Sequence, residues 1–145
     1  MRGLFEHQFL SFKKKHMLNL IAMARADGKF HKKELEVLYK IGRKYELKPR
    51  HVDDLLALNK LPEPVKPANH DKCMEQLYDL VEMMLADGVI EKTEIEFCLN
   101  FVRKFGYKES LLEIMINYIQ SEIKDHESWK VFKQESMALK ISIEI

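Results

Sequence analysis

The chain has 145 residues, of which 46% are hydrophobic and 32% are charged. These values indicate one folded domain with a core of its own and exclude a disordered chain. Five glycines and four prolines favour long helices over a turn-rich β architecture. No apolar run approaches the roughly 18 residues of a membrane span, and no signal pattern opens the chain. We therefore expect a cytoplasmic protein.

The pattern of apolar residues predicts a helical protein from end to end. The expected helices cover about residues 4–25, 31–45 and 49–58 in the first half, and 71–85, 91–105, 108–124 and 126–139 in the second. The fold class is therefore all-α, with about seven helices in a single bundle-like domain.

Several local features refine these helices. The polar run at 13–16 predicts either a break or bend in the first helix, or one long helix with a solvated turn. Gly42 lies inside a helix, where it costs about 1 kcal/mol relative to alanine, so we expect another helix to approach it closely. Pro49 is placed to begin the third helix. The connector 60–69 holds three of the four prolines, and the tail 141–145 alternates like a strand without a partner.

One helix–turn–helix unit occurs twice. Ala26-Asp27-Gly28, followed by Glu34, recurs 60 residues later as Ala86-Asp87-Gly88, followed by Glu94. The correspondence needs no gap from residues 20–48 to 80–108. We expect two pseudo-symmetric units, at about 15–58 and 71–120, joined by the connector 60–69 and followed by a C-terminal helix and tail at 126–145.

The two turns resemble the second half of an EF-hand calcium loop, in which a carboxylate precedes a glycine and a glutamate closes the loop. The first half of that loop is absent. Its first and third ligand positions would be Met23 and Arg25, and in the second copy Met83 and Leu85. These side chains provide no hard oxygen ligand for Ca²⁺, so an EF-hand is excluded.

Two interpretations of the repeated residues remain open. In the first, the glutamates lie three residues into their helices and complete a capping interaction, so the turns are purely structural. In the second, the turns come together and hold a divalent cation. The proposed ligands are Asp27, Glu34, Asp87 and Glu94. An acidic helical stripe of Asp71, Glu75, Asp79 and Glu82 leads towards the second turn, and a cation or the basic half of the chain would offset its repulsion.

The net charge of +1 hides an asymmetry between the halves. Residues 1–60 carry 14 Lys and Arg against 7 Asp and Glu, whereas the remainder carries 10 against 16. This pattern can steer a polyanion, bind an acidic partner or let the halves attract each other. The basic residues lack the setting of a DNA-reading helix, so a solvated face is favoured and nucleic acid is an unlikely partner.

Catalytic chemistry finds little support in the sequence. Cys73 and Cys98 are too few for a disulfide framework and too isolated for a zinc site. The six histidines have no pair at i, i+4, and no P-loop, GxSxG or HExxH motif occurs. A binding module is therefore favoured over an enzyme.

The repeated Ala-Asp-Gly…Glu signature, set in a small all-helical chain, resembles the TerB-like family, which is named for bacterial tellurite resistance. The resemblance covers about residues 15–120. It implies a helical domain with pseudo-two-fold repeats, a metal-binding acidic cluster at Asp27, Glu34, Asp87 and Glu94, and a role in stress response. Related domains occur beside DnaJ-type co-chaperone modules. The alternative is accordingly a protein-interaction module, with an apolar patch around Trp129, Phe132 and Met137.

Overall fold

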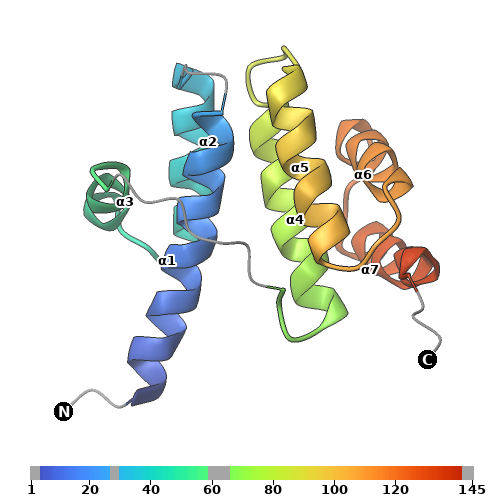
Figure 1. Ribbon diagram of the computed structural model, residues 1–145, viewed down its shortest axis with the longest axis horizontal. Coiled ribbons are helices and arrows are strands. Elements are labelled where there is room, and N and C mark those ends of the chain that lie inside the picture. The colour runs from blue at the N-terminus through green and yellow to red at the C-terminus, as the bar shows by residue number, and fades with distance from the viewer. Residues whose placement is uncertain (1–3, 27–29, 59–65, 142–145) are drawn as a thin grey trace.

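The computed structural model describes residues 4–26, 30–58 and 66–141, with side chains from Phe12 onward. This part of the chain is all-α, as predicted (Figure 1). Its elements are α1 (Leu4–Ala24), α2 (Lys32–Lys44), α3 (Pro49–Leu56), α4 (His70–Leu85), α5 (Lys92–Lys104), α6 (Ser110–Gln120), α7 (His126–Ser136) and the 3-10 helix η1 (Met137–Leu139). None of these helices is long and apolar enough to cross a membrane.

Helix α4 lies at the centre of the bundle. It packs against α1 and α2 on one side and against α5, α6 and α7 on the other. Figure 1 shows α1 with α2, and α4 with α5, as two antiparallel hairpins; the end of α1 and the start of α2 lie at the same end of the molecule as the turn between α4 and α5. Apolar side chains from most helices form one continuous core, which includes Leu20, Leu38, Leu77, Leu80 and Phe101.

The polar run at 13–16 does not break α1, which is one continuous helix. The reason is that its polar side chains find partners on other elements. Nζ of Lys13 donates a hydrogen bond to the carbonyl oxygen of Tyr45 over 2.7 Å. His16 is buried and bonds to Asp79 on α4. Lys14 and Lys15 are exposed, so the run is solvated on one side of a continuous helix and contacts other elements through Lys13 and His16 on the other.

Two local predictions are confirmed by the geometry. A Cβ atom at Gly42 would lie only 2.9 Å from Cγ2 of Val52 on α3, so the glycine permits a close helix contact. Pro49 stands in the first turn of α3, where a missing N–H group costs nothing. The turn residues 27–29, residues 59–65 with most of the predicted connector 60–69, and the tail residues 142–145 lie outside the described residues.

Helices α2 and α5 correspond closely. Each has 13 residues, and their starts, Lys32 and Lys92, are 60 positions apart. Residues 31–40 and 91–100 also share the same succession of buried and exposed positions. These features agree with the repeat seen in the sequence, while a pseudo-two-fold relation between complete units stays a prediction.

A buried carboxylate on α4 ties three helices together. Asp79 is 1% exposed. Its Oδ2 atom is 2.9 Å from Nε2 of His16 on α1 and accepts a hydrogen bond of 2.6 Å from the Tyr45 hydroxyl group. Its Oδ1 atom accepts a hydrogen bond of 2.9 Å from Nζ of Lys44, the last residue of α2. Both carboxylate oxygens of Asp79 therefore have partners from the basic N-terminal half.

The surroundings of Asp79 favour its charged form. Burial alone would raise the pKa of this carboxyl group, but the hydrogen bond and charge of His16, the charge of Lys44 and the hydrogen bond from Tyr45 outweigh burial and hold the pKa below its usual value. In return, burial and the Asp79 charge raise the pKa of the Tyr45 hydroxyl group far above its ordinary range. The Asp79 carboxylate is thus charged and paired through both oxygens, whereas Nδ1 of His16 is buried without a hydrogen-bond partner among the described residues.

Replacing Gly42 by alanine should destabilise the protein despite the better helix propensity of alanine. Alanine gains about 1 kcal/mol in a helix, whereas forcing a methyl group against a packed neighbour typically costs about 1–3 kcal/mol. Urea unfolding of Gly42→Ala, alone and combined with Val52→Ala, measures both effects. The cost of Gly42→Ala should shrink in the Val52→Ala background; an equal cost in both backgrounds would contradict the close contact.

Replacing Asp79 by asparagine should cost about 3–5 kcal/mol, because Lys44 and His16 would face a neutral amide in a buried place. Since the folded-state pKa of Asp79 lies below its unfolded value, its stabilisation is present above about pH 4 and is lost as the pH falls through the folded pKa. Urea unfolding at several pH values should therefore show a smaller acid-side loss for Asp79→Asn than for the natural chain.

The matched control for Asp79→Asn is Asp71→Asn, on the same helix. The Asp71 side chain is 67% exposed and pairs with Lys133 over 3.5 Å, and surface pairs of this kind contribute less than about 1 kcal/mol. Equal destabilisation by the two substitutions would show that the Asp79 cluster does not hold the helices together.

Candidate metal centre

Three potential metal ligands meet where the two hairpin turns lie. His31 precedes α2, Glu34 lies in its first turn, and Asp87 follows α4. One ligand atom from each, an imidazole nitrogen or a carboxylate oxygen, lies within 4.8 Å of the other two. Glu94, in the first turn of α5, is close enough to Glu34 to form a hydrogen bond when one of the two carries a proton. The sequence-predicted residues Glu34, Asp87 and Glu94 thus lie together.

The capping interpretation of the repeated glutamates is confirmed in both copies. Oε1 of Glu34 accepts a hydrogen bond of 3.0 Å from the backbone N–H of His31, at the start of α2. Oε1 of Glu94 accepts the equivalent bond from Glu91, over 3.4 Å, at the start of α5. These bonds satisfy N–H groups that lack a partner within the helix. Each glutamate therefore has a structural role through one of its oxygens.

The second oxygen of Glu34 is not explained by capping. Glu34 is 1% exposed, and its Oε2 atom is buried without a well-aligned hydrogen-bond partner among the described residues. The Glu94 side chain lies within range of Glu34 but does not provide such a bond to Oε2. A buried carboxylate oxygen without a donor costs about 1–3 kcal/mol or more. Among the described residues of the cluster, Oε2 of Glu34 is therefore the atom whose burial calls for a further partner.

The charge on Glu34 is correspondingly unfavourable. Burial, the largest influence, raises the pKa of its carboxyl group, and the negative charge of Asp87 acts in the same direction. The hydrogen bonds from His31 and Glu94 and the charge of His31 oppose this change, but the pKa remains above its usual value. A cation bound at Oε2 would supply the missing compensation.

Asp87 divides its two oxygens in a similar way. Oδ1 accepts a hydrogen bond of 3.0 Å from the backbone N–H of Val89, across a turn in which Gly88 has a φ angle of 78°. Oδ2 lies 3.3 Å from Nε2 of His31, on the other hairpin. One oxygen therefore holds the turn, and the other faces the cluster.

The remaining acidic residues of the prediction lie elsewhere. Asp27 is outside the described residues, so its place in the cluster stays a prediction. The acidic stripe of α4 is not assembled at the turns: besides Asp79 in its buried network, Glu82 pairs with Lys40 over 3.5 Å and Asp71 pairs with Lys133. Attraction between the two halves, one of the alternatives drawn from the charge asymmetry, thus accounts for Asp79 and Glu82.

His31 is the ligand candidate that the sequence analysis missed. A histidine pair at i, i+4 is the usual sequence signal for a metal ligand on a helix, and His31 has no such partner. The available signal was the spacing of three between His31 and Glu34, which places a helix-preceding residue beside the first turn. Its second neighbour, Asp87, is 56 positions away in the chain, so only the contact between the hairpins reveals it.

The predicted apolar patch on α7 is only partly exposed. Phe132 is buried, with 8% exposure, because it packs on Tyr118 and Trp129. Met137 is 47% exposed, and Val131 is 48% exposed. The prediction was therefore wrong for Phe132, whose aromatic contacts with α6 require it in the interior.

Comparison of the chain with known protein families, with curated proteins and with solved structures finds no match. The resemblance to the TerB-like family therefore remains a prediction that depends on the repeated residues alone.

Replacing Glu34 by glutamine should separate its two roles without metal. Glutamine keeps an oxygen for the His31 N–H group but carries no charge, so the protein should be at least as stable as the natural chain at neutral pH. Because the folded-state pKa of Glu34 is raised, the advantage should disappear as the pH falls below about 4, where the carboxyl group is protonated in both states. Chemical unfolding across this pH range measures the effect.

Glu34→Ala is the comparison variant, since it removes the cap as well and should lose about 0.5–2 kcal/mol. A loss of the same size for Glu34→Gln would contradict the division of roles between Oε1 and Oε2.

Proposed function

We propose that this protein is a non-enzymatic module that binds a divalent metal ion between its two hairpin turns. The observation that carries the proposal is the buried Oε2 atom of Glu34, which has no well-aligned donor among the described residues and lies with His31 and Asp87 in one group of potential ligands. Structural needs explain Oε1 of Glu34 and Oδ1 of Asp87. Oε2 of Glu34 and Oδ2 of Asp87 remain available to an ion.

The donor set favours one class of metal. Ca²⁺ and Mg²⁺ prefer oxygen ligands, whereas an imidazole nitrogen beside carboxylates suits Zn²⁺, Mn²⁺ and similar first-row ions. His31 would supply the nitrogen, and Glu34 and Asp87 would each supply an oxygen. Glu94 and the predicted ligand Asp27 are the further candidates. The expected order of affinity is therefore Zn²⁺ above Mn²⁺, and Mn²⁺ above Ca²⁺.

A bound ion would link the two halves of the chain. His31 and Glu34 belong to the first hairpin and Asp87 belongs to the second, so coordination would add a contact between them at the end opposite to Lys44. Such a link would make the stability of the protein depend on the metal concentration. This behaviour fits the metal binding and the role in stress response that the TerB-like resemblance implies.

A protein partner at the same end is supported by exposed apolar side chains. Val89 and Ile90, in the turn next to Asp87, are 55% and 41% exposed. A partner that covers this turn would contact the metal ligands as well. The protein-interaction function of the sequence analysis is thus a second proposal, placed at the turns rather than on α7.

Metal-dependent stability tests the proposed site. Zn²⁺ or Mn²⁺ added to protein stripped with a chelator should raise the melting temperature, because an ion at 100 times its Kd stabilises the folded state by about 2.7 kcal/mol. Glu34→Gln, His31→Asn and Asp87→Asn should each reduce the rise strongly. Ca²⁺ at the same concentration should have the smallest effect.

The matched control is Asp54→Asn, on an exposed position of α3 that is not among the potential ligands. This variant should keep the full metal response. The proposal fails if no ion shifts the melting temperature at millimolar concentration, or if Asp54→Asn weakens the shift as much as Asp87→Asn does.

A further inference from the structure

A second candidate site lies at the other end of α2, away from the metal centre. A cavity of ≈ 310 Å³ opens where the end of α2, the middle of α4, α6 and the start of α7 meet. Lys44 lines it, and Lys44 is the last residue of a helix of 13 residues, so it is about 20 Å from the helix start beside the proposed metal ligands. The cavity is therefore independent of that site.

One wall of the cavity is aromatic and fixed in place. The ring of Trp129 lies 5.1 Å from that of Tyr78 and 5.7 Å from that of Tyr118, measured between centroids. Trp129 also stacks on Phe132, and the Tyr118 hydroxyl group is 2.9 Å from Oγ of Ser128. This wall offers half-buried apolar surface without needing to rearrange.

The cavity also presents a fixed cation. The Lys44 ammonium group is held by Asp79 over 2.9 Å and lies over the rings of Tyr45 and Tyr78, at 5.4 and 5.8 Å from their centroids. Its side chain remains 46% exposed. An ammonium group has three N–H donors, of which Asp79 takes one, so donors remain for an anionic group in the cavity.

Charges of both signs line the same cavity. Lys124 and Glu75 form no ion pair within the part of the chain that the structure describes. Asp125, by contrast, is committed to capping α7, since its Oδ1 atom accepts a hydrogen bond of 2.8 Å from the Ser128 N–H group. The charges that a ligand would meet are therefore cationic at Lys44, which keeps N–H donors besides the one bound to Asp79, cationic at Lys124 and anionic at Glu75.

These features select the ligand by exclusion. A purely cationic ligand would face Lys44 and Lys124, and a purely anionic ligand would face Glu75. An uncharged apolar ligand would cover part of the surface of these groups without giving any of them a partner. A small zwitterion with an apolar body satisfies each of them. The volume also lies at the lower limit of ordinary ligand pockets, which measure about 300–1,000 Å³.

We propose that this cavity binds a free amino acid with an apolar side chain. Its carboxylate would bind Lys44 and Lys124, its ammonium group would bind Glu75, and its side chain would pack against Tyr78 and Trp129.

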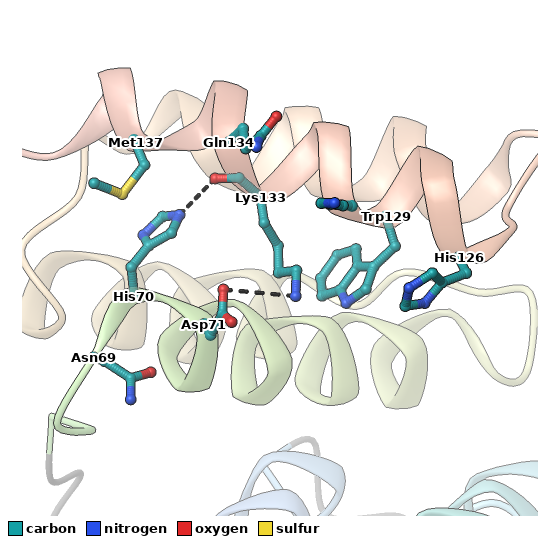
Figure 2. A pocket seen from close by; sticks show the side chains of 9 residues that line it. Asn69, His70, Asp71, His126, Trp129, Lys133, Gln134 and Met137 are labelled. Atoms are coloured by element: carbon teal, nitrogen blue, oxygen red, sulfur yellow. Dashed lines mark hydrogen bonds and ion pairs between the residues drawn. The ribbon is translucent and has the colours of Figure 1, made fainter.

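A larger neighbouring cavity, of ≈ 600 Å³, is a weaker candidate although it shares His126 and Trp129 (Figure 2). Its polar groups largely satisfy one another. Lys133 pairs with Asp71 over 3.5 Å and lies 5.7 Å from the centroid of Trp129. His70 is 2.7 Å from the Lys133 carbonyl oxygen and 2.6 Å from the Tyr107 hydroxyl group. Few fixed charges remain there for a ligand.

The single tryptophan of the chain, Trp129, makes the test direct. L-phenylalanine, L-leucine and L-methionine are titrated against the full chain while Trp129 emission is recorded, and calorimetry checks each result. Phenylpropionate lacks the ammonium group, and phenylethylamine lacks the carboxylate. We expect saturable binding of at least one amino acid, with both analogues of phenylalanine at least about 10-fold weaker than phenylalanine itself, a difference of about 1.4 kcal/mol.

Glu75→Gln should weaken the binding of L-phenylalanine, whose ammonium group loses its partner, but not that of phenylpropionate, whose carboxylate no longer faces a like charge. Glu82→Gln is the matched control on the same helix; Glu82 pairs with Lys40 outside the cavity, so this variant should bind as the natural chain does. The proposal is overturned if no amino acid binds the folded protein at millimolar concentration. It is equally overturned if phenylpropionate binds as tightly as phenylalanine, or if Glu82→Gln loses as much affinity as Glu75→Gln.

Discussion

The buried carboxylate of Asp79 is the contact on which the arrangement of the helices depends. Removing a charge from water costs several kcal/mol, and only good geometry with all its hydrogen bonds in place offsets that cost. Here His16, Lys44 and Tyr45 provide three partners from α1 and the end of α2. Apolar packing alone tolerates a small slide of one helix along another, whereas this set of bonds accepts one register of α2 against α4.

That register determines what lies at both ends of α2. At its beginning, His31 and Glu34 lie opposite Asp87, and the two hairpins together form the candidate metal centre. At its end, Lys44 reaches the cavity beside Tyr78 and Trp129. A slide of one helical turn, about 5.4 Å, would separate the ligand candidates and remove the cation from the cavity. The two candidate sites are thus separate in space but share one structural support.

Much of this architecture could be predicted because its causes are local. Pro49 indicates a helix start because it lacks an N–H group, and Gly42 indicates a close helix contact because it lacks a side chain. The capping glutamates act over only three residues. The predictions that failed depend on contacts distant in sequence. His16 was expected to be solvated because its partner, Asp79, is 63 positions away. Phe132 was expected to be exposed because Tyr118, which covers it from α6, belongs to a different helix.

For the candidate site, residue types and spacing identified Glu34, Asp87 and Glu94. They could not identify His31 as a neighbour of Asp87, because no periodicity relates the two hairpins to each other. Nor could the sequence divide the roles of two oxygens on one carboxylate, since that division depends on which oxygen faces a backbone N–H group and which faces the interior.

The same division has a consequence for the speed and cost of capturing an ion. Glu34 and Asp87 are already held by backbone N–H groups of His31 and Val89, so their rotamers are fixed before any ligand arrives. Ordering a flexible side chain at an interface costs about 0.5–1.5 kcal/mol, and these two residues avoid that loss. The conformational entropy of these two side chains is therefore lost during folding. An ion that binds later meets two carboxylates that are already in position.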